Sequence, residues 1–187
     1  MKPERLLGLR LSIIEGGREL AATKLIKLGE GNLSARIDQD RFFVTPTMTD
    51  KAKLETDELM EVEISSHRVP EGASTEVGLH RAIYAQFPLV HAVVHAHPEK
   101  VLALAEDGLA PDPCLLPDGG SVLDRVSWID DFPPGSRSLA QEVAMGIAKA
   151  PALVIAAHGA VTIGATVGQA VLRMIRLERL ALMTRGG

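Results

Sequence analysis

Cysteine and aromatic residues are scarce in this chain of 187 residues, and each scarcity excludes a class of protein. The single cysteine, Cys114, rules out a disulfide framework within the chain and is typical of a protein in the reducing cytosol. Aromatic residues make up only 3% of the chain, and the formal net charge is −4. The sequence therefore lacks the stacking platform and the basic surface that nucleic-acid binding uses, and we expect no such partner.

Long uninterrupted apolar runs are also missing. Residues 150–172 form the most apolar stretch, but Pro151, His158, Gln169 and several glycines interrupt it, so it is no candidate for a membrane span. The first ten residues mix charged side chains with leucines and contain no cleavage site of small residues, which argues against a signal peptide. We expect a cytoplasmic protein with no membrane partner.

Hydrophobic residues make up 46% of the chain, enough for one core in a single domain over residues 1–187. Apolar periodicity and turn residues then divide the sequence into elements. The predicted helices lie within residues 3–27, 51–61, 74–86, 98–106, 138–149 and 166–184, and the predicted strands within 29–37, 41–45, 61–65, 90–97, 121–128 and 152–157. This order indicates the α/β class, with a central, mainly antiparallel sheet flanked by helices.

The most informative stretch is the run Val90-His91-Ala92-Val93-Val94-His95-Ala96-His97-Pro98. Its composition predicts a buried strand, in which successive side chains point to opposite faces of the sheet. The three histidines then share one face, and Pro98 ends the strand because proline has no N–H to donate. Two imidazoles side by side at a strand end, His95 and His97, can bind one metal ion.

A second apolar strand, residues 152–157, is also followed by a histidine, His158, and then by a turn glycine, Gly159. Three neutral imidazoles leave the fourth position of a tetrahedral zinc ion open, as in catalytic zinc sites. A histidine at a strand end can equally be a core residue that is hydrogen-bonded to backbone. The two patterns alone leave both interpretations open.

Three turns rich in hydroxyl and amide groups accompany these histidines: Gly31-Asn32-Leu33-Ser34, Thr45-Pro46-Thr47 and Ser74-Thr75-Glu76. Such groups, with loop N–H groups and a helix N-terminus, bind a phosphate without a lysine. Ordinary turns and helix caps would explain each turn separately, with Ser74 or Thr75 as the N-cap of the following helix.

Taken together and in this order, these motifs resemble the class II aldolase/adducin family over nearly the whole chain. Its members include fuculose- and rhamnulose-phosphate aldolases, ribulose-phosphate 4-epimerase and methylthioribulose-phosphate dehydratase. The resemblance implies a three-layer α/β/α fold, with Glu76 as the proton-transfer residue, which can also approach the metal. It also implies the zinc ligands His95, His97 and His158 and a phosphate pocket formed by Asn32, Thr45, Thr47, Ser74 and Thr75.

The activity that the resemblance implies is metal-dependent cleavage of a carbon–carbon bond in a small phosphorylated ketose, by a cytosolic homotetramer like fuculose-phosphate aldolase. Zinc suits the ligands, although Mn²⁺, Co²⁺ or Fe²⁺ would fit as well. A dehydratase or a 4-epimerase on the same site is an alternative, and Asp50-Lys51 resembles the dehydratase branch. A non-catalytic, adducin-like interaction module is another, but adducin-type members have lost the metal ligands that this chain keeps.

Two positions depart from the family pattern. Met48 stands where members commonly have glycine after the Thr-Pro turn. The fuculose aldolases use a tyrosine from the segment after the histidine strand, whereas the only tyrosine here, Tyr84, precedes that strand. The corresponding loop, residues 111–128, instead contains Asp112, Asp118, Ser121 and Asp124. We expect His80 and His91 to be structural or to support the ligands rather than to bind metal.

Overall fold

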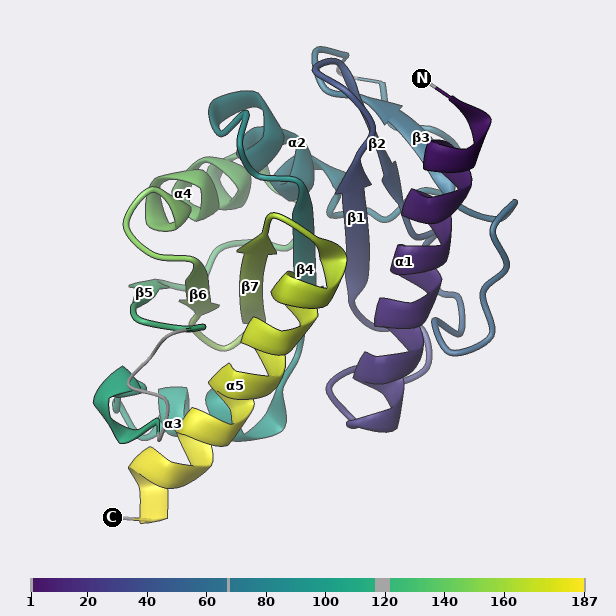
Figure 1. Ribbon diagram of the computed structural model, residues 1–187. Coiled ribbons are helices and arrows are strands. Elements are labelled where there is room, and N and C mark those ends of the chain that lie inside the picture. The colour runs from purple at the N-terminus through teal and green to yellow at the C-terminus, as the bar shows by residue number, and fades with distance from the viewer. Residues whose placement is uncertain (1, 67, 117–121, 187) are drawn as a thin grey trace.

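Seven strands form one sheet in the order β3-β2-β1-β4-β7-β6-β5 (Figure 1). The computed structural model describes residues 2–66, 68–116 and 122–186. The strands are Asn32–Arg36 (β1), Arg41–Val44 (β2), Met60–Glu63 (β3), Ala92–Ala96 (β4), Val126–Ile129 (β5), Ala152–Ile155 (β6) and Gly159–Gly164 (β7). All neighbouring strands are antiparallel except β5 and β6, which pair in parallel. The predicted mainly antiparallel α/β sheet is confirmed, as a mixed sheet.

Helices cover both faces of the sheet, which gives the three layers that the resemblance implies. They are Pro3–Ala22 (α1), Val77–Gln86 (α2), Glu99–Glu106 (α3), Arg137–Ile147 (α4) and Val167–Gly186 (α5), with a short 3₁₀ turn at Pro113–Leu115 (η1). Apolar side chains of α1, α3 and α5 form one core with one face of the sheet. Those of α2 and α4 form a second core on the other face. In Figure 1, α1 and α5 lie side by side across the same face.

Strand β4 shows the alternation that the sequence predicts. Ala92, Val94 and Ala96 pack into the core with α1, α3 and α5, whereas Val93 packs into the core with α2 and α4. His95 lies on the same side as Val93 and is fully buried. The histidine therefore faces the layer that contains α2.

Two predictions of secondary structure are wrong. The short helix predicted within residues 51–61 is absent: residues 51–59 form turns and irregular backbone, and β3 begins at Met60. Residues 159–164, which lie between the predicted strand at 152–157 and the predicted helix at 166–184 and for which a turn is expected, form the interior strand β7. Both faces of β7 are buried, so its sequence lacks the alternation of polar and apolar residues that marks a half-buried strand. The predicted strand at 121–128 is β5, at residues 126–129.

Among the described residues, no helix has both the length and the apolar character that crossing a bilayer requires.

Candidate metal centre and active site

Three neighbouring strands bring the candidate residues to one edge of the sheet. Antiparallel pairing sets Asn32, the first residue of β1, directly opposite His95 near the end of β4. On the other side of β4, His95 pairs with Val161 of β7, so His158, which precedes β7, lies at the same edge. The pairing thus gathers residues that lie far apart in the sequence.

Glu76 reaches this edge from the start of α2. It occupies the N-cap position of α2, so the predicted N-cap of Ser74 or Thr75 is wrong. The Glu76 side chain makes no capping hydrogen bond. Ser74 Oγ instead accepts a hydrogen bond from the Glu76 backbone N–H at 3.3 Å, which tightens the turn before the helix. The carboxylate of Glu76 is therefore free to face the histidines.

Glu76, His95, His97 and His158 form one cluster, with a potential ligand atom of each lying within 4.8 Å of the others. Glu76 Oε2 lies 3.1 Å from His95 Nε2, and Glu76 Oε1 lies 3.0 Å from His158 Nε2. The Nε2 atoms of His95 and His97 are 3.2 Å apart. The structure thus brings together all three predicted metal ligands and the predicted catalytic carboxylate.

The cluster fits a divalent cation on three observations. Zinc with metal–nitrogen distances of about 2.0–2.1 Å holds tetrahedral ligand atoms about 3.3–3.4 Å apart, close to the spacings found here. His95 Nδ1 lies 3.0 Å from the Ala160 carbonyl oxygen, to which it donates, so Nε2 presents its lone pair to the cluster. Glu76 Oε1 is buried and has no hydrogen-bond partner in the described structure. Such a set of inward lone pairs needs a cation or protons to balance it.

Polar groups also lie behind two of the candidate ligands, where metal sites usually have groups that orient the ligands. Besides the bond from His95 to Ala160, His97 Nδ1 lies 3.7 Å from Glu30 Oε2. Glu30 is not among the site residues predicted from the sequence. It lies between Gly29 and Gly31, both of which have positive φ, so the tight turn that places this carboxylate is the signal that could have indicated it.

Charges in the cluster are set by burial and by hydrogen bonds. Burial alone would raise the pKa of Glu76, but the neighbouring side chains of His158, His95 and Asn32 outweigh it and hold that pKa far below its usual value. Burial and the neighbouring His95 lower the pKa of His97 to about 4. Near neutral pH the site therefore offers a carboxylate and, at His97, an unprotonated imidazole.

Two of the predicted phosphate-pocket turns lie side by side. The bridge between Pro46 and Ala73 and the hydrogen bond from Thr47 N–H to the Gly72 carbonyl, at 2.9 Å, join them. Thr75 is exposed, and Thr47 is half-buried. The turns therefore form one rim beside the cluster.

The other three predicted pocket residues are already engaged within the protein. Asn32 Nδ2 donates to Ser74 Oγ at 3.1 Å and to Glu76 Oε2 at 3.0 Å. Thr45 is fully buried, and its Oγ1 accepts a hydrogen bond from the Leu33 N–H at 3.2 Å. The Thr45 hydroxyl thus holds β1 to the end of β2.

The two departures from the family pattern have structural counterparts. Met48 has a φ of 54°, a left-handed conformation that glycine adopts more easily, and its side chain is exposed. Met48 thus adopts the left-handed backbone conformation that a glycine would favour at this position of the turn. Tyr84 is buried, and its hydroxyl lies 2.8 Å from Ser34 Oγ, so it is no accessible proton donor. Asp118 and Ser121 of the corresponding loop lie outside the described residues.

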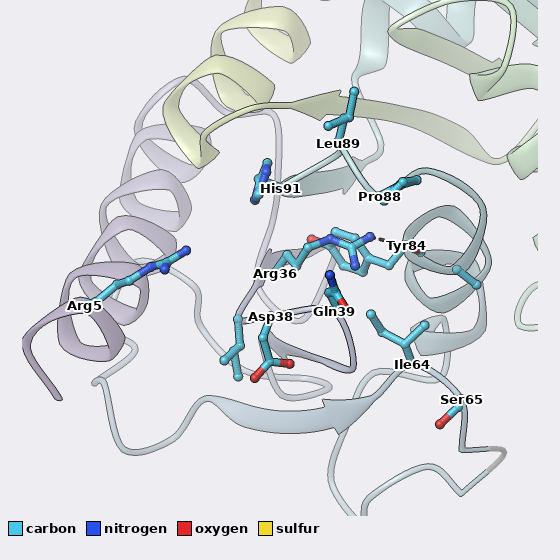
Figure 2. Close-up of a pocket in the computed structure, with 12 residues that line it drawn as sticks. Arg5, Arg36, Asp38, Gln39, Ile64, Ser65, Tyr84, Pro88, Leu89 and His91 are labelled. Carbon is cyan, nitrogen blue, oxygen red and sulfur yellow. Dashed lines mark hydrogen bonds between the residues drawn. The ribbon is translucent and has the colours of Figure 1, made fainter. Parts of the chain in front are cut away.

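A cavity of about 880 Å³ lies at the opposite end of β1, near Arg36, and not at the cluster (Figure 2). The Arg36 guanidinium donates to the carbonyls of Tyr84, Phe87 and Val90 and so caps the end of α2. His91 lines this cavity and is not part of the cluster, in agreement with its predicted role outside the ligand set.

The sequence matches the family model described as the Class II Aldolase and Adducin N-terminal domain over residues 12–184. The chain belongs to this family. The match covers every motif in the cluster and in the two turns, so the resemblance inferred from the sequence is confirmed.

Relatives within the class II aldolase family catalyse different reactions. A 3-oxo-tetronate 4-phosphate decarboxylase from Haemophilus influenzae is 30% identical over 158 residues, 82% of this chain and 75% of that protein. A methylthioribulose-1-phosphate dehydratase from Pectobacterium carotovorum is also 30% identical, over 80% of each chain. The crystal structure of an L-fuculose-1-phosphate aldolase from Thermus thermophilus has a TM-score of 0.83 and 30% identity, over 97% of this chain and 93% of that one.

Gly159 is predicted to be essential for the geometry of the cluster. A Cβ at this position would lie 2.6 Å from the Ala96 carbonyl oxygen and 2.7 Å from His97 Cδ2, closer than such atoms approach. Gly159→Ala should therefore push β7 away from β4 and weaken metal binding by about tenfold or more, measured by competition with a chelator. Gly168→Ala is the matched control, because nothing lies within 4 Å of its Cβ position. Equal affinity of the two variants would contradict this prediction.

The metal-free protein is predicted to lose stability in mild acid. Burial lowers the pKa of His80 to about 3 and that of His97 to about 4, whereas both are near 6.5 in the unfolded chain. Between pH 6.5 and pH 4 the unfolded state thus binds more protons, so the free energy of unfolding falls as the pH falls, by about 1.4 kcal/mol per pH unit for each histidine. Urea unfolding of chelator-treated protein at several pH values measures this slope. His80→Gln should reduce it, and a flat profile would contradict the prediction.

Proposed function

We propose that this chain is a metal-dependent aldolase, which cleaves a carbon–carbon bond of a small phosphorylated ketose in the manner of fuculose-phosphate aldolase. The observation that carries the proposal is the cluster of Glu76 with His95, His97 and His158 at the edge of the sheet. The crystal structure of an L-fuculose-1-phosphate aldolase shares the fold at 30% identity, which supports it.

His95, His97 and His158 would hold the metal, for which we propose Zn²⁺, with Mn²⁺, Co²⁺ or Fe²⁺ as alternatives. The cation would supply a Lewis acid for the carbonyl oxygen of the ketose, which stabilises the enediolate formed when the carbon–carbon bond breaks. The proton is then handled by the protein. Glu76 is a carboxylate, and its Oε1 can take up a proton from water and deliver it to the carbon freed by the cleavage, while the proton of the hydroxyl that becomes the aldehyde goes to another group.

The rim beside the cluster is proposed to bind the phosphate. Thr47, Ser74 and Thr75 offer hydroxyls, and the amide of Asn32 connects this rim to Glu76. Thr45 would support the rim from within the sheet. A phosphate fixed here would hold the reacting carbons beside Glu76, which lowers the entropic part of the barrier.

Decarboxylation of a phosphorylated 3-oxo acid is the second candidate, and one observation favours it. Aldol cleavage needs a group that takes the proton from the hydroxyl that becomes the aldehyde, a role that the fuculose aldolases give to a tyrosine. The only tyrosine here is buried against Ser34. Loss of CO₂ from a 2-hydroxy-3-oxo acid leaves an enediolate of the same kind without that proton transfer, so the only proton needed is the one that Glu76 takes from water and delivers to carbon. The decarboxylase from Haemophilus influenzae is 30% identical.

We further propose a homotetramer in the cytoplasm. Family resemblance supports the tetramer, and the single cysteine supports a reducing compartment. Light scattering of the purified protein tests the assembly, and a single protomer in solution would overturn it.

The proposed function is tested on tag-free protein reconstituted with Zn²⁺. The protein is incubated with a panel of ketose 1-phosphates and of phosphorylated 3-oxo acids. The formation of aldehyde, of CO₂ and of the dehydrated product is followed separately. Aldehyde release supports the aldolase, and CO₂ release replaces it with the second candidate. Water loss or epimerisation would move the chain to the dehydratase or epimerase branch. Absence of bound metal, with none taken up at micromolar supply, would make an adducin-like binding module the leading account.

A further inference from the structure

A chain of buried polar groups lies behind Glu76, and three of its members, Ser34, His80 and Tyr84, have no role in the mechanism above. On α2 and the residue before it, Glu76, His80 and Tyr84 recur every four residues, which puts them on one face of the helix. On β1, Asn32 and Ser34 are two residues apart and share one face of the strand. The two sets interleave, and each of these side chains is at most 8% exposed.

The hydrogen bonds of Asn32 fix the state of His80. Both N–H groups of the Asn32 amide are used, toward Ser74 Oγ and Glu76 Oε2. The oxygen of the amide, Oδ1, is therefore the atom that faces His80, and it lies 2.5 Å from His80 Nε2. An amide oxygen can only accept a hydrogen bond. His80 Nε2 must carry the proton.

The hydrogen bonds at the other nitrogen of His80, Nδ1, run in the same donor-to-acceptor direction. His80 is fully buried, and burial lowers its pKa to about 3, so the ring is neutral and Nδ1 has a lone pair. Ser34 Oγ lies 2.6 Å from Nδ1 and donates to it, and Tyr84 donates to Ser34 Oγ at 2.8 Å. All the donors therefore point one way, from Tyr84 to the carboxylate. Hydrogen bonds in such a chain strengthen one another.

We propose that His80 is a positioning residue that, as a neutral imidazole protonated on Nε2, holds the Asn32 amide with its N–H groups toward Glu76 and Ser74. Glu76 Oε2 is thereby anchored, and Oε1, which has no such partner, is the oxygen that moves the proton. Without His80 the amide can turn over, which sets its carbonyl oxygen against the carboxylate. The link to turnover rests on the proposed function, whereas the tautomer of His80 does not.

The first test is the tautomer itself. Long-range ¹H–¹⁵N correlation on the full chain, labelled at histidine nitrogens, distinguishes a proton on Nε2 from one on Nδ1, and comparison with His80→Gln assigns the signals. We expect the Nε2-protonated neutral form of His80 in both metal-free and zinc-loaded protein. A ring protonated on Nδ1, or on both nitrogens at neutral pH, would overturn the proposal.

The second test compares two amides at position 80. The Gln amide can occupy the place of Nε2 and donate to Asn32, whereas the shorter Asn amide reaches only the place of Nδ1. With the substrate found above, His80→Asn should lower kcat by about tenfold or more with KM, zinc content and unfolding temperature little changed, and His80→Gln should restore most of kcat. The absorption spectrum of the Co²⁺-substituted protein should shift in His80→Asn and not in His80→Gln. His91→Gln, outside the cluster, is the matched control.

The outcomes separate the two proposals. Equal kcat and equal Co²⁺ spectra in both His80 variants would overturn the positioning role. If His80→Asn does not fold, Ser34→Ala replaces it, because loss of the Ser34 hydroxyl removes the second hydrogen bond that fixes the His80 ring; unchanged kcat and an unchanged Co²⁺ spectrum would then overturn the role. Wild-type protein with the expected tautomer and spectra but no turnover of any tested phosphate would count against the proposed function alone.

Discussion

His95→Ala is expected to empty the metal site and to abolish turnover. His95 is fully buried at the centre of the cluster, and its Nε2 lies close to both Glu76 and His97. Removing one of three imidazole ligands leaves two, too few for a stable catalytic zinc site. Elemental mass spectrometry should find about one ion per chain in the wild type and nearly none in the variant.

His91→Ala is the control for this experiment. His91 stands four residues earlier, is exposed and belongs to the cavity near Arg36 rather than to the cluster. It should keep both metal and activity. Full metal content in His95→Ala would show that the cluster is not the metal site and would remove the basis of the lyase proposal.

Glu76→Gln is expected to lose turnover while keeping much of the metal. The amide has nearly the same shape and can still accept from Asn32, but it cannot carry a proton to the substrate carbon. Loss of a general acid–base group lowers kcat by about 10²–10⁴-fold. Steady-state kinetics at saturating Zn²⁺, with metal content measured on the same samples, separates the chemical effect from loss of the ion.

A carboxylate far from the cluster provides the comparison for Glu76. Glu61 of β3 pairs with Arg41 at 2.7 Å, and both side chains are partly exposed. Glu61→Gln should leave kcat within about twofold, as surface ion pairs contribute little. If Glu76→Gln behaves in the same way, the proton is moved by another group and the mechanism fails.

The clustering of the candidate ligands could be predicted because it depends on short-range rules. The alternation in β4 and the position of His158 at the end of an apolar strand are visible in the sequence, and both lead to the observed edge of the sheet. The order of the strands is not visible, because β4 pairs with β1 and β7, which are distant in the chain. β7 was not predicted because both of its faces are buried, so polar and apolar residues do not alternate along its sequence.

Side-chain orientation limited the prediction of the phosphate pocket. A hydroxyl in a turn can face a ligand or bridge two strands, and the sequence is the same in either case. The Thr45 hydroxyl bridges two strands by accepting from the Leu33 N–H, whereas Thr75 is exposed at the rim. The role of His80 likewise depends on the interleaving of α2 with β1, which only the tertiary structure reveals.

The candidate ligands lie at the ends of β4 and β7, two interior strands of the sheet, and this position affects how the protein would acquire a metal. β4 and β7 are flanked by other strands and packed on both faces, so their core forms without help from an ion. The chain should therefore fold first and be metallated afterwards, unlike small domains that fold only around zinc. A site that is already folded before the ion binds can exchange ions with the solution. The metal that occupies it in a cell would then depend on the free concentration of each competing ion and on its affinity for the site.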